Sequence, residues 1–145
     1  MIFIPELKTY DLFISHAWKY GDEYDRLVGL LDKAPYFKYR NYSAPKDKPL
    51  SNLDKSPADT SEEIKDAIRR KINPVNCVVV ISGMYYNHRK WMQFEIDYAK
   101  EKEKPIVAIK PYGNINMPSE IQSVADIVVN WNTDSIVSAI RKYSL

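Results

Sequence analysis

The feature that most constrains the fold is a continuous apolar run near the middle of the chain, NCVVVIS, at residues 76–82. It lacks the apolar and polar alternation of a strand with one face in water, and its β-branched residues favour a strand. An uninterrupted run of this length is typical of a parallel strand covered on both faces. We therefore predict a central parallel strand, which requires helical crossovers and an α/β architecture.

The rest of the chain alternates between further strand candidates and helical patterns. Apolar residues at helical spacing predict helices over residues 21–34, 59–72, 90–100 and 132–143. The second of these has a capping-box candidate in Thr60 and Glu63 and a stop at Pro74, and the last opens on capping residues. The other strands are expected at residues 10–17, 37–43, 105–110 and 125–131.

Five strands interleaved with helices predict a doubly wound sheet. By length, the best match is a single flavodoxin-like domain over residues 1–145, with five parallel strands in the order 2-1-3-4-5 and helices on both faces. The irregular segment at residues 43–60 contains Pro45, Pro49 and Pro57 but no glycine. A loop this long within a compact domain is usually functional or mobile.

The charge balance and the apolar runs exclude several classes of partner. With 21 basic and 19 acidic residues the net charge is +2, which is not the electrostatic footprint of a nucleic-acid-binding protein. No segment approaches the 18 or more apolar residues of a membrane span, and the N-terminal stretch MIFIPELK lacks the pattern of a secretory signal. The one cysteine, Cys77, is expected to pack as a small buried hydrophobe, so we expect a reduced, cytoplasmic setting.

In a sheet of this order, ligands bind beyond the carboxyl ends of the strands, where the strand order reverses. Three strand ends should meet there, those of the first, second and third strands. The polar and aromatic residues expected around this crevice are Ser15, His16, Trp18, Asn41, Tyr42, Ser43, Ser82, Gly83 and Tyr85.

Several chemistries common on such folds lack their motifs here. The turn after the first strand is HAWKYG, where a dinucleotide-binding domain would carry GxGxxG. A phospho-accepting receiver needs an aspartate at the end of the third strand, where this chain has Ser82 and Gly83. A receiver also has a lysine-proline pair after its fifth strand, whereas Lys110 and Pro111 follow the fourth strand here. With two histidines and one cysteine, no metal-binding motif of the HExxH or CxxC type exists.

One carboxylate lies where an apolar residue is expected. In KWMQFEIDYAK, at residues 90–100, an advance of 100° per residue puts Glu95 near the centre of the apolar arc. An unpaired charge buried there would cost several kcal/mol or more. The position is tolerable if this arc is partly core and partly the wall of a crevice.

Taken in order along the chain, FISHAW after the first strand, the long proline-bearing loop, VVVIS at the third strand and WMQFE in the next helix resemble a TIR domain. The strongest match is the W-x-x-x-E pattern of Trp91 and Glu95. Over residues 10–143 the chain looks more specifically like the ThsB-type TIR proteins of Thoeris anti-phage defence. The lysine-bearing, glycine-free loop at residues 43–60 departs from many catalytic TIR domains, so its contacts are not carried over.

The resemblance implies an enzyme that cleaves NAD+ at the nicotinamide-ribose bond and makes a cyclic ADP-ribose-type signal. Its catalytic residue would be Glu95, with NAD+ as substrate and no tightly bound cofactor or metal. It further implies self-association through TIR surfaces and a downstream effector reached through a diffusible nucleotide, without nucleic acid or membrane. The positions carried over for substrate binding are Ser15, His16, Trp18, Tyr42, Ser43, Ser82 and Trp91.

Other roles stay open for some of these residues. His16 could instead form a hydrogen bond with the backbone at a strand end. For Trp91, packing in the core is favoured about two to one over stacking on an aromatic ring of the substrate. TIR domains also serve as noncatalytic interaction modules. In such a module Glu95 would bond to a neighbouring backbone group or to a lysine side chain.

Overall fold

The computed structural model describes residues 8–15, 22–43, 62–84, 89–111 and 116–145, without the side chains at 22, 63, 64, 84 and 89–91. Five parallel strands form one sheet in the order β2-β1-β3-β4-β5. The predicted order 2-1-3-4-5 is therefore confirmed. The strands are β1 (Thr9–Ser15), β2 (Lys38–Asn41), β3 (Cys77–Ile81), β4 (Ile106–Ile109) and β5 (Ile127–Val129).

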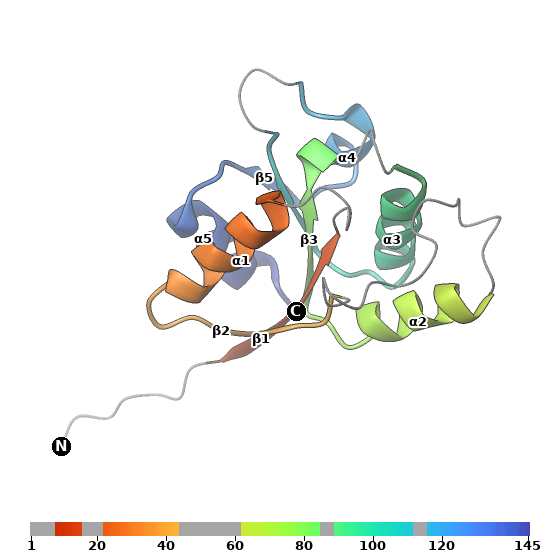
Figure 1. Ribbon diagram of the computed structural model, residues 1–145, viewed down its shortest axis with the longest axis horizontal. Helices are drawn as coiled ribbons and strands as arrows, with labels where there is room; N and C mark the ends of the chain where they lie inside the picture. Colours follow the sequence, from red (N-terminus) through yellow and green to blue (C-terminus); the bar gives the residue numbers. More distant parts are fainter. Residues whose placement is uncertain (1–7, 16–21, 44–61, 85–88, 112–115) are drawn as a thin grey trace.

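Helices cover both faces of this sheet, as the flavodoxin-like prediction requires. In Figure 1 the sheet separates α1 and α5 from α2 and α3, and each of these pairs packs side by side. The order of elements alternates between strands and helices along the chain. The helices are α1 (Asp22–Lys33), α2 (Glu62–Ile72), the 3-10 turn η2 (Ser82–Met84), α3 (Arg89–Glu101), α4 (Ser119–Gln122) and α5 (Thr133–Tyr143).

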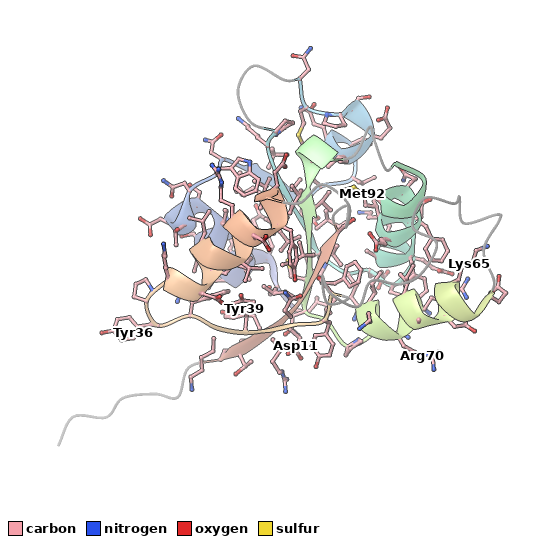
Figure 2. The ribbon with its side chains drawn as sticks, in the orientation of Figure 1. Asp11, Tyr36, Tyr39, Lys65, Arg70 and Met92 are labelled. Carbon is pink, nitrogen blue, oxygen red and sulfur yellow. The ribbon has the colours of Figure 1, made fainter. Side chains whose placement is uncertain are left out.

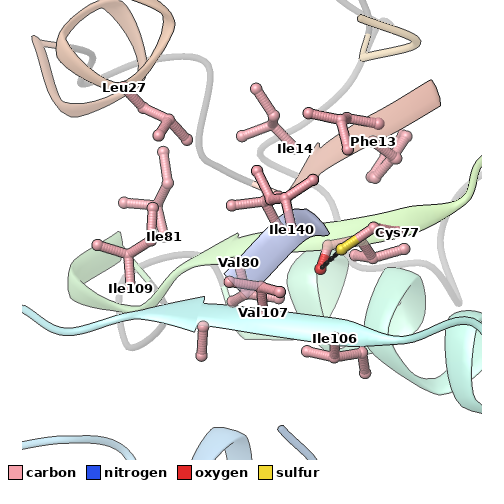
Figure 3. Packing of buried hydrophobic residues seen from close by; sticks show 14 of the residues in the cluster. Phe13, Ile14, Leu27, Cys77, Val80, Ile81, Ile106, Val107, Ile109 and Ile140 are labelled. Carbon is pink, nitrogen blue, oxygen red and sulfur yellow. Dashed lines mark hydrogen bonds between the residues drawn. The ribbon is translucent and has the colours of Figure 1, made fainter. Parts of the chain in front are cut away.

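The apolar run at the middle of the chain forms the centre of the sheet. All five residues of β3 are fully buried, and the strand pairs with β1 on one side and β4 on the other. Figure 3 shows Ile81, at the end of β3, facing Leu27 of α1. Both faces of β3 are thus covered, which explains why its sequence has no polar alternation.

At the ends of two strands, side chains take over the hydrogen bonding. At the start of β4, the backbone N–H of Ile106 donates to the carboxylate of Asp126 at 2.7 Å. Beyond β2, the N–H of Ile14 donates to the hydroxyl of Ser43 at 2.7 Å. These bonds satisfy buried backbone groups without extending the ladder.

The helices bury the faces that their sequences predict. In α3, Met92, Glu95 and Ile96 are buried while Asp97 is exposed, and Figure 2 shows Met92 on the side that faces the sheet. Figure 2 also shows Arg70 of α2 pointing away from the sheet.

Two further expectations concern the helices. The capping box at Thr60 and Glu63 lies outside the described residues and side chains. Among the helices that the structure describes, none combines the length and the apolar character needed to span a membrane.

Candidate active site

The candidate site lies where β1 and β3 end side by side. Ser15 is the last residue of β1 and pairs with Val80 of β3. Ser82 follows two residues after Val80 and opens the turn η2. The parallel pairing therefore brings Ser15 and Ser82 to the same edge of the sheet, as the switch-point argument predicted.

Glu95 reaches this edge from α3. Its side chain is buried, with 9% of the residue exposed, and Ser15 is 0% exposed. The Ser15 hydroxyl donates a hydrogen bond of 2.8 Å to Oε1 of Glu95. Residues 80 positions apart in the sequence thus form one buried polar pair in an otherwise apolar layer.

The surroundings of Glu95 favour its neutral form. Burial raises the pKa of Glu95 to about 8, and the hydrogen bond from Ser15 partly counteracts this because it stabilises the ionised form. A carboxylic acid that changes charge near neutral pH can act as a base or stabilise a cation. Strongly perturbed carboxyl groups at a sheet edge are candidates for functional sites.

Ser82 contributes a buried hydroxyl to the same edge of the sheet. Ile81 at the end of β3 faces Leu27 of α1 (Figure 3), and Ser82 opens the 3-10 turn that follows it. Ser82 is 1% exposed, and its hydroxyl has no hydrogen-bond partner among the described residues. A buried hydroxyl without a partner costs about 1–3 kcal/mol, which is a reason to look for a ligand there.

A second carboxylate, which was not among the expected site residues, lies close to the turn η2. A Cβ atom at Gly83 would come within 3.1 Å of a carboxylate oxygen of Glu23, in the first turn of α1. A side chain at position 83 would therefore displace this carboxylate. Glu23 belongs to no motif, so only its acidic character in the helix after the first strand could have drawn attention to it.

At the end of β2 the polar groups serve mainly to hold the sheet together. The backbone N–H of Tyr42 donates to the carbonyl of Leu12 at 2.8 Å, which continues the pairing with β1. Ser43 is 7% exposed, accepts from the N–H of Ile14 and donates to the carbonyl of Ile14 at 3.2 Å. Asn41 donates to the hydroxyl of Tyr24 at 2.7 Å and so links β2 to α1.

The remaining expected site residues fall outside what the structure describes. His16 and Trp18 lie in residues 16–21, Tyr85 lies in residues 85–88, and the loop at 44–61 is also outside. Trp91 lies in the first turn of α3, but its side chain is not among those described.

Two other chemistries were considered for this chain, a cysteine nucleophile and a bound metal ion. Cys77 is fully buried, and burial raises the pKa of its thiol to about 12, so the thiolate nucleophile is suppressed at neutral pH. Within the described part of the chain, no three His, Cys, Asp or Glu side chains are grouped so that they could hold a metal ion.

Comparisons with known proteins identify the family of this chain. A protein of Cytobacillus dafuensis named "Putative cyclic ADP-D-ribose synthase TIR2" is 24% identical over 138 residues, which are 90% of this chain. The chain spans 33% of the length of that curated relative. The family model "Thoeris protein ThsB, TIR-like domain" matches residues 13–116, a range that includes Ser15, Ser82 and Glu95. The chain therefore belongs to the ThsB TIR-like domain family.

Proposed function

We propose that this chain is a TIR-domain signalling enzyme that cleaves NAD+ at the nicotinamide-ribose bond and makes a cyclic ADP-ribose-type signal in anti-phage defence. The observation that carries the proposal is the buried Glu95 carboxyl group, held by Ser15 at the carboxyl edge of the sheet. The family membership and the name of the C. dafuensis relative support the choice of NAD+ as substrate.

The chemistry needs one carboxylate. When the bond from C1′ of the ribose to the nicotinamide nitrogen breaks, both electrons leave with the ring, which departs as neutral nicotinamide. No general acid is required, whereas most glycoside hydrolases need two carboxyl groups. The ribose is left with oxocarbenium character, and an ionised Glu95 stabilises this developing positive charge.

The same carboxyl group acts as the base when the cyclic product closes. A hydroxyl of the remaining nucleotide attacks C1′ and must lose its proton as the new bond forms. Glu95 accepts that proton, and a carboxyl group whose pKa lies near neutrality is suited to this step. Attack by water instead of an internal hydroxyl would give linear ADP-ribose.

A substrate contact by the hydroxyl of Ser82 is part of the same proposal. Its lack of a hydrogen-bond partner among the described residues would be relieved by a polar group of the nucleotide. His16, Trp18, Tyr42 and Trp91 remain proposals for the walls of the site. Self-association, which could bring the loop of one copy against the next, is part of the same proposal.

The decisive experiment is incubation with NAD+ at several protein concentrations, with nicotinamide and cyclic products followed by chromatography. Glu95→Gln should lower kcat by about 100-fold or more, because the charge that stabilises the transition state is lost. Glu101→Gln is the matched control, since it removes an exposed carboxylate from the same helix and should leave turnover unchanged.

Equal turnover by wild type and Glu95→Gln would remove the catalytic role of Glu95. No turnover by either protein, repeated in extracts of phage-infected cells, would favour the noncatalytic interaction module. A rate per molecule that rises with protein concentration would support a site completed by self-association.

A further inference from the structure

The hydrogen bond between Ser15 and Glu95 uses the whole donor capacity of the serine. A hydroxyl group has one proton, and that of Ser15 is given to Oε1 of Glu95 at 2.8 Å. Ser15 is 0% exposed, so its hydroxyl lies behind the carboxyl group rather than open to solvent. This geometry differs from that of a residue whose hydroxyl is presented to a substrate.

The backbone of Ser15 is fixed on two sides. Ser15 pairs with Val80 in the central strand, and the preceding residue, Ile14, exchanges two hydrogen bonds with the Ser43 hydroxyl. A donor on so constrained a backbone returns the carboxyl group to one orientation. Rigid support of this kind is what a reacting group needs in order to be preorganised.

The charged groups on neighbouring elements are engaged elsewhere. On α2, which packs against α3, Arg69 is paired with Glu62 and Asp66. Lys65, also on α2, lies 3.7 Å from Glu62.

The sheet adds little charge around the carboxyl group. Asp11 of β1 is paired with Arg40 of β2, and β3 and β4 carry no charged residue. Glu23 of α1 lies against Gly83, in the turn η2. Among the described residues, Ser15 is therefore the group that offsets the burial of Glu95.

We propose that Ser15 is a positioning residue, which fixes the Glu95 carboxylate through Oε1 and leaves Oε2 for the substrate. The inference rests on the proposed function, and it replaces the substrate contact expected of Ser15. Ser15 then acts through Glu95 on two quantities, the orientation of the carboxylate and the pH at which it ionises. Neither quantity depends on a contact between Ser15 and the nucleotide.

The first test measures Glu95 directly and needs no activity. The carboxyl carbon of Glu95 is followed by 13C NMR as a function of pH in wild type, Ser15→Ala, Ser15→Cys and Ser123→Ala. Loss of the hydrogen bond in Ser15→Ala should raise the pKa of Glu95 by about one unit. The thiol of Ser15→Cys is a weaker donor and should give an intermediate rise. Ser123→Ala removes an exposed hydroxyl that donates to the carbonyl of Glu120, so the pKa of Glu95 should stay where it is.

The second test is the pH profile of NAD+ cleavage. If ionised Glu95 is the active form, the acidic limb of kcat should move to higher pH in Ser15→Ala by the same interval as the pKa. At pH 7 this lowers kcat about tenfold, with KM within a factor of two of wild type and recovery of rate at higher pH. A substrate contact would instead raise KM and leave the limb in place.

The outcomes separate this inference from the proposed function. Turnover by wild type with an unmoved pKa and an unmoved limb in Ser15→Ala would overturn the positioning role and leave the enzyme standing. A shifted pKa in a protein that never cleaves NAD+ would refute the proposed function while keeping the hydrogen-bond role. If Ser15→Ala does not fold, Ser15→Cys decides the question, because it preserves the size of the side chain.

Discussion

At the scale of single residues, Glu95 is a position where the chain accepts a cost in stability. Its carboxyl group lies in an apolar layer with one hydrogen bond, from Ser15, in the described structure. Burial raises its pKa from an ordinary value of 4.5 to about 8, so the folded state holds its proton more tightly than the unfolded chain does. Such costs are typical of sites whose chemistry needs a particular group.

This pKa predicts how stability changes with pH. Well below pH 4.5 the carboxyl group is neutral in both states, so its ionisation adds no penalty. As the pH rises from 4.5 to 8, the unfolded chain ionises first, and the free energy of unfolding falls until the folded state also ionises. Glu95→Gln removes this penalty and should be more stable than wild type by on the order of 4 kcal/mol at pH 8.

The measurement is urea denaturation of both proteins at pH 4, 6 and 8. The difference between them should be small at the lowest pH and grow with each step. Glu101→Gln, which changes an exposed carboxylate on the same helix, should show no such growth. A difference that is constant across the pH range would mean that Glu95 does not titrate as its burial implies.

At the scale of elements, the sequence predicts those whose pattern is local and repeated. The β-branched run of β3 and the apolar stripe of α5 each identify their element without tertiary information. Helix α4 was not predicted, because four residues are too few to show a helical period. The bonding beyond the C-terminal end of β2 was also not predictable, since a serine hydroxyl there bonds to a residue 29 positions away.

In the candidate site, too, local patterns were predictable from the sequence and long-range contacts were not. Glu95 was predictable because one helical wheel shows a carboxylate on an apolar arc. The role of Ser15 was not, because the Ser15–Glu95 bond joins residues 80 positions apart and a serine at a strand end can as well face a substrate. Glu23 lay outside every motif, and its contact with Gly83 depends on how α1 docks against η2.

The cap of α5 gives a prediction at this scale. The side chain of Asn132 accepts a hydrogen bond from the N–H of Ser135 at 3.0 Å, and four residues of this helix are buried against the sheet. Asn132→Ala leaves that N–H unpaired at the helix start and should lower the free energy of unfolding by about 1 kcal/mol. Asn132→Ser retains an acceptor and should recover most of the loss. Chemical denaturation of the three proteins measures this, and an equal loss in both variants would show that the cap is not the cause.

At the scale of the whole molecule, the two edges of the sheet have different roles. The carboxyl edge carries Ser15, Ser82 and Glu95, whereas the amino edge is closed by backbone and side-chain bonds. Asn76, just before β3, accepts from the N–H of Asp11 through its side chain at 2.8 Å and donates its own N–H to the Asp11 carbonyl at 2.7 Å. Its carbonyl also accepts from the N–H of Leu145 at 3.1 Å.

This division predicts that stability and function can be changed separately. Asn76→Ala removes the acceptor of the Asp11 N–H and should lower the free energy of unfolding by about 1–2 kcal/mol. The length of β3, roughly 20 Å from Asn76 to Ser82 at the usual rise per residue, separates this change from the site. Under conditions where the variant remains folded, the pKa of Glu95 and the rate of NAD+ cleavage per molecule should therefore equal those of wild type. Denaturation, the 13C titration of Glu95 and the turnover assay test this together, and a shifted pKa would show that the sheet transmits strain between its edges.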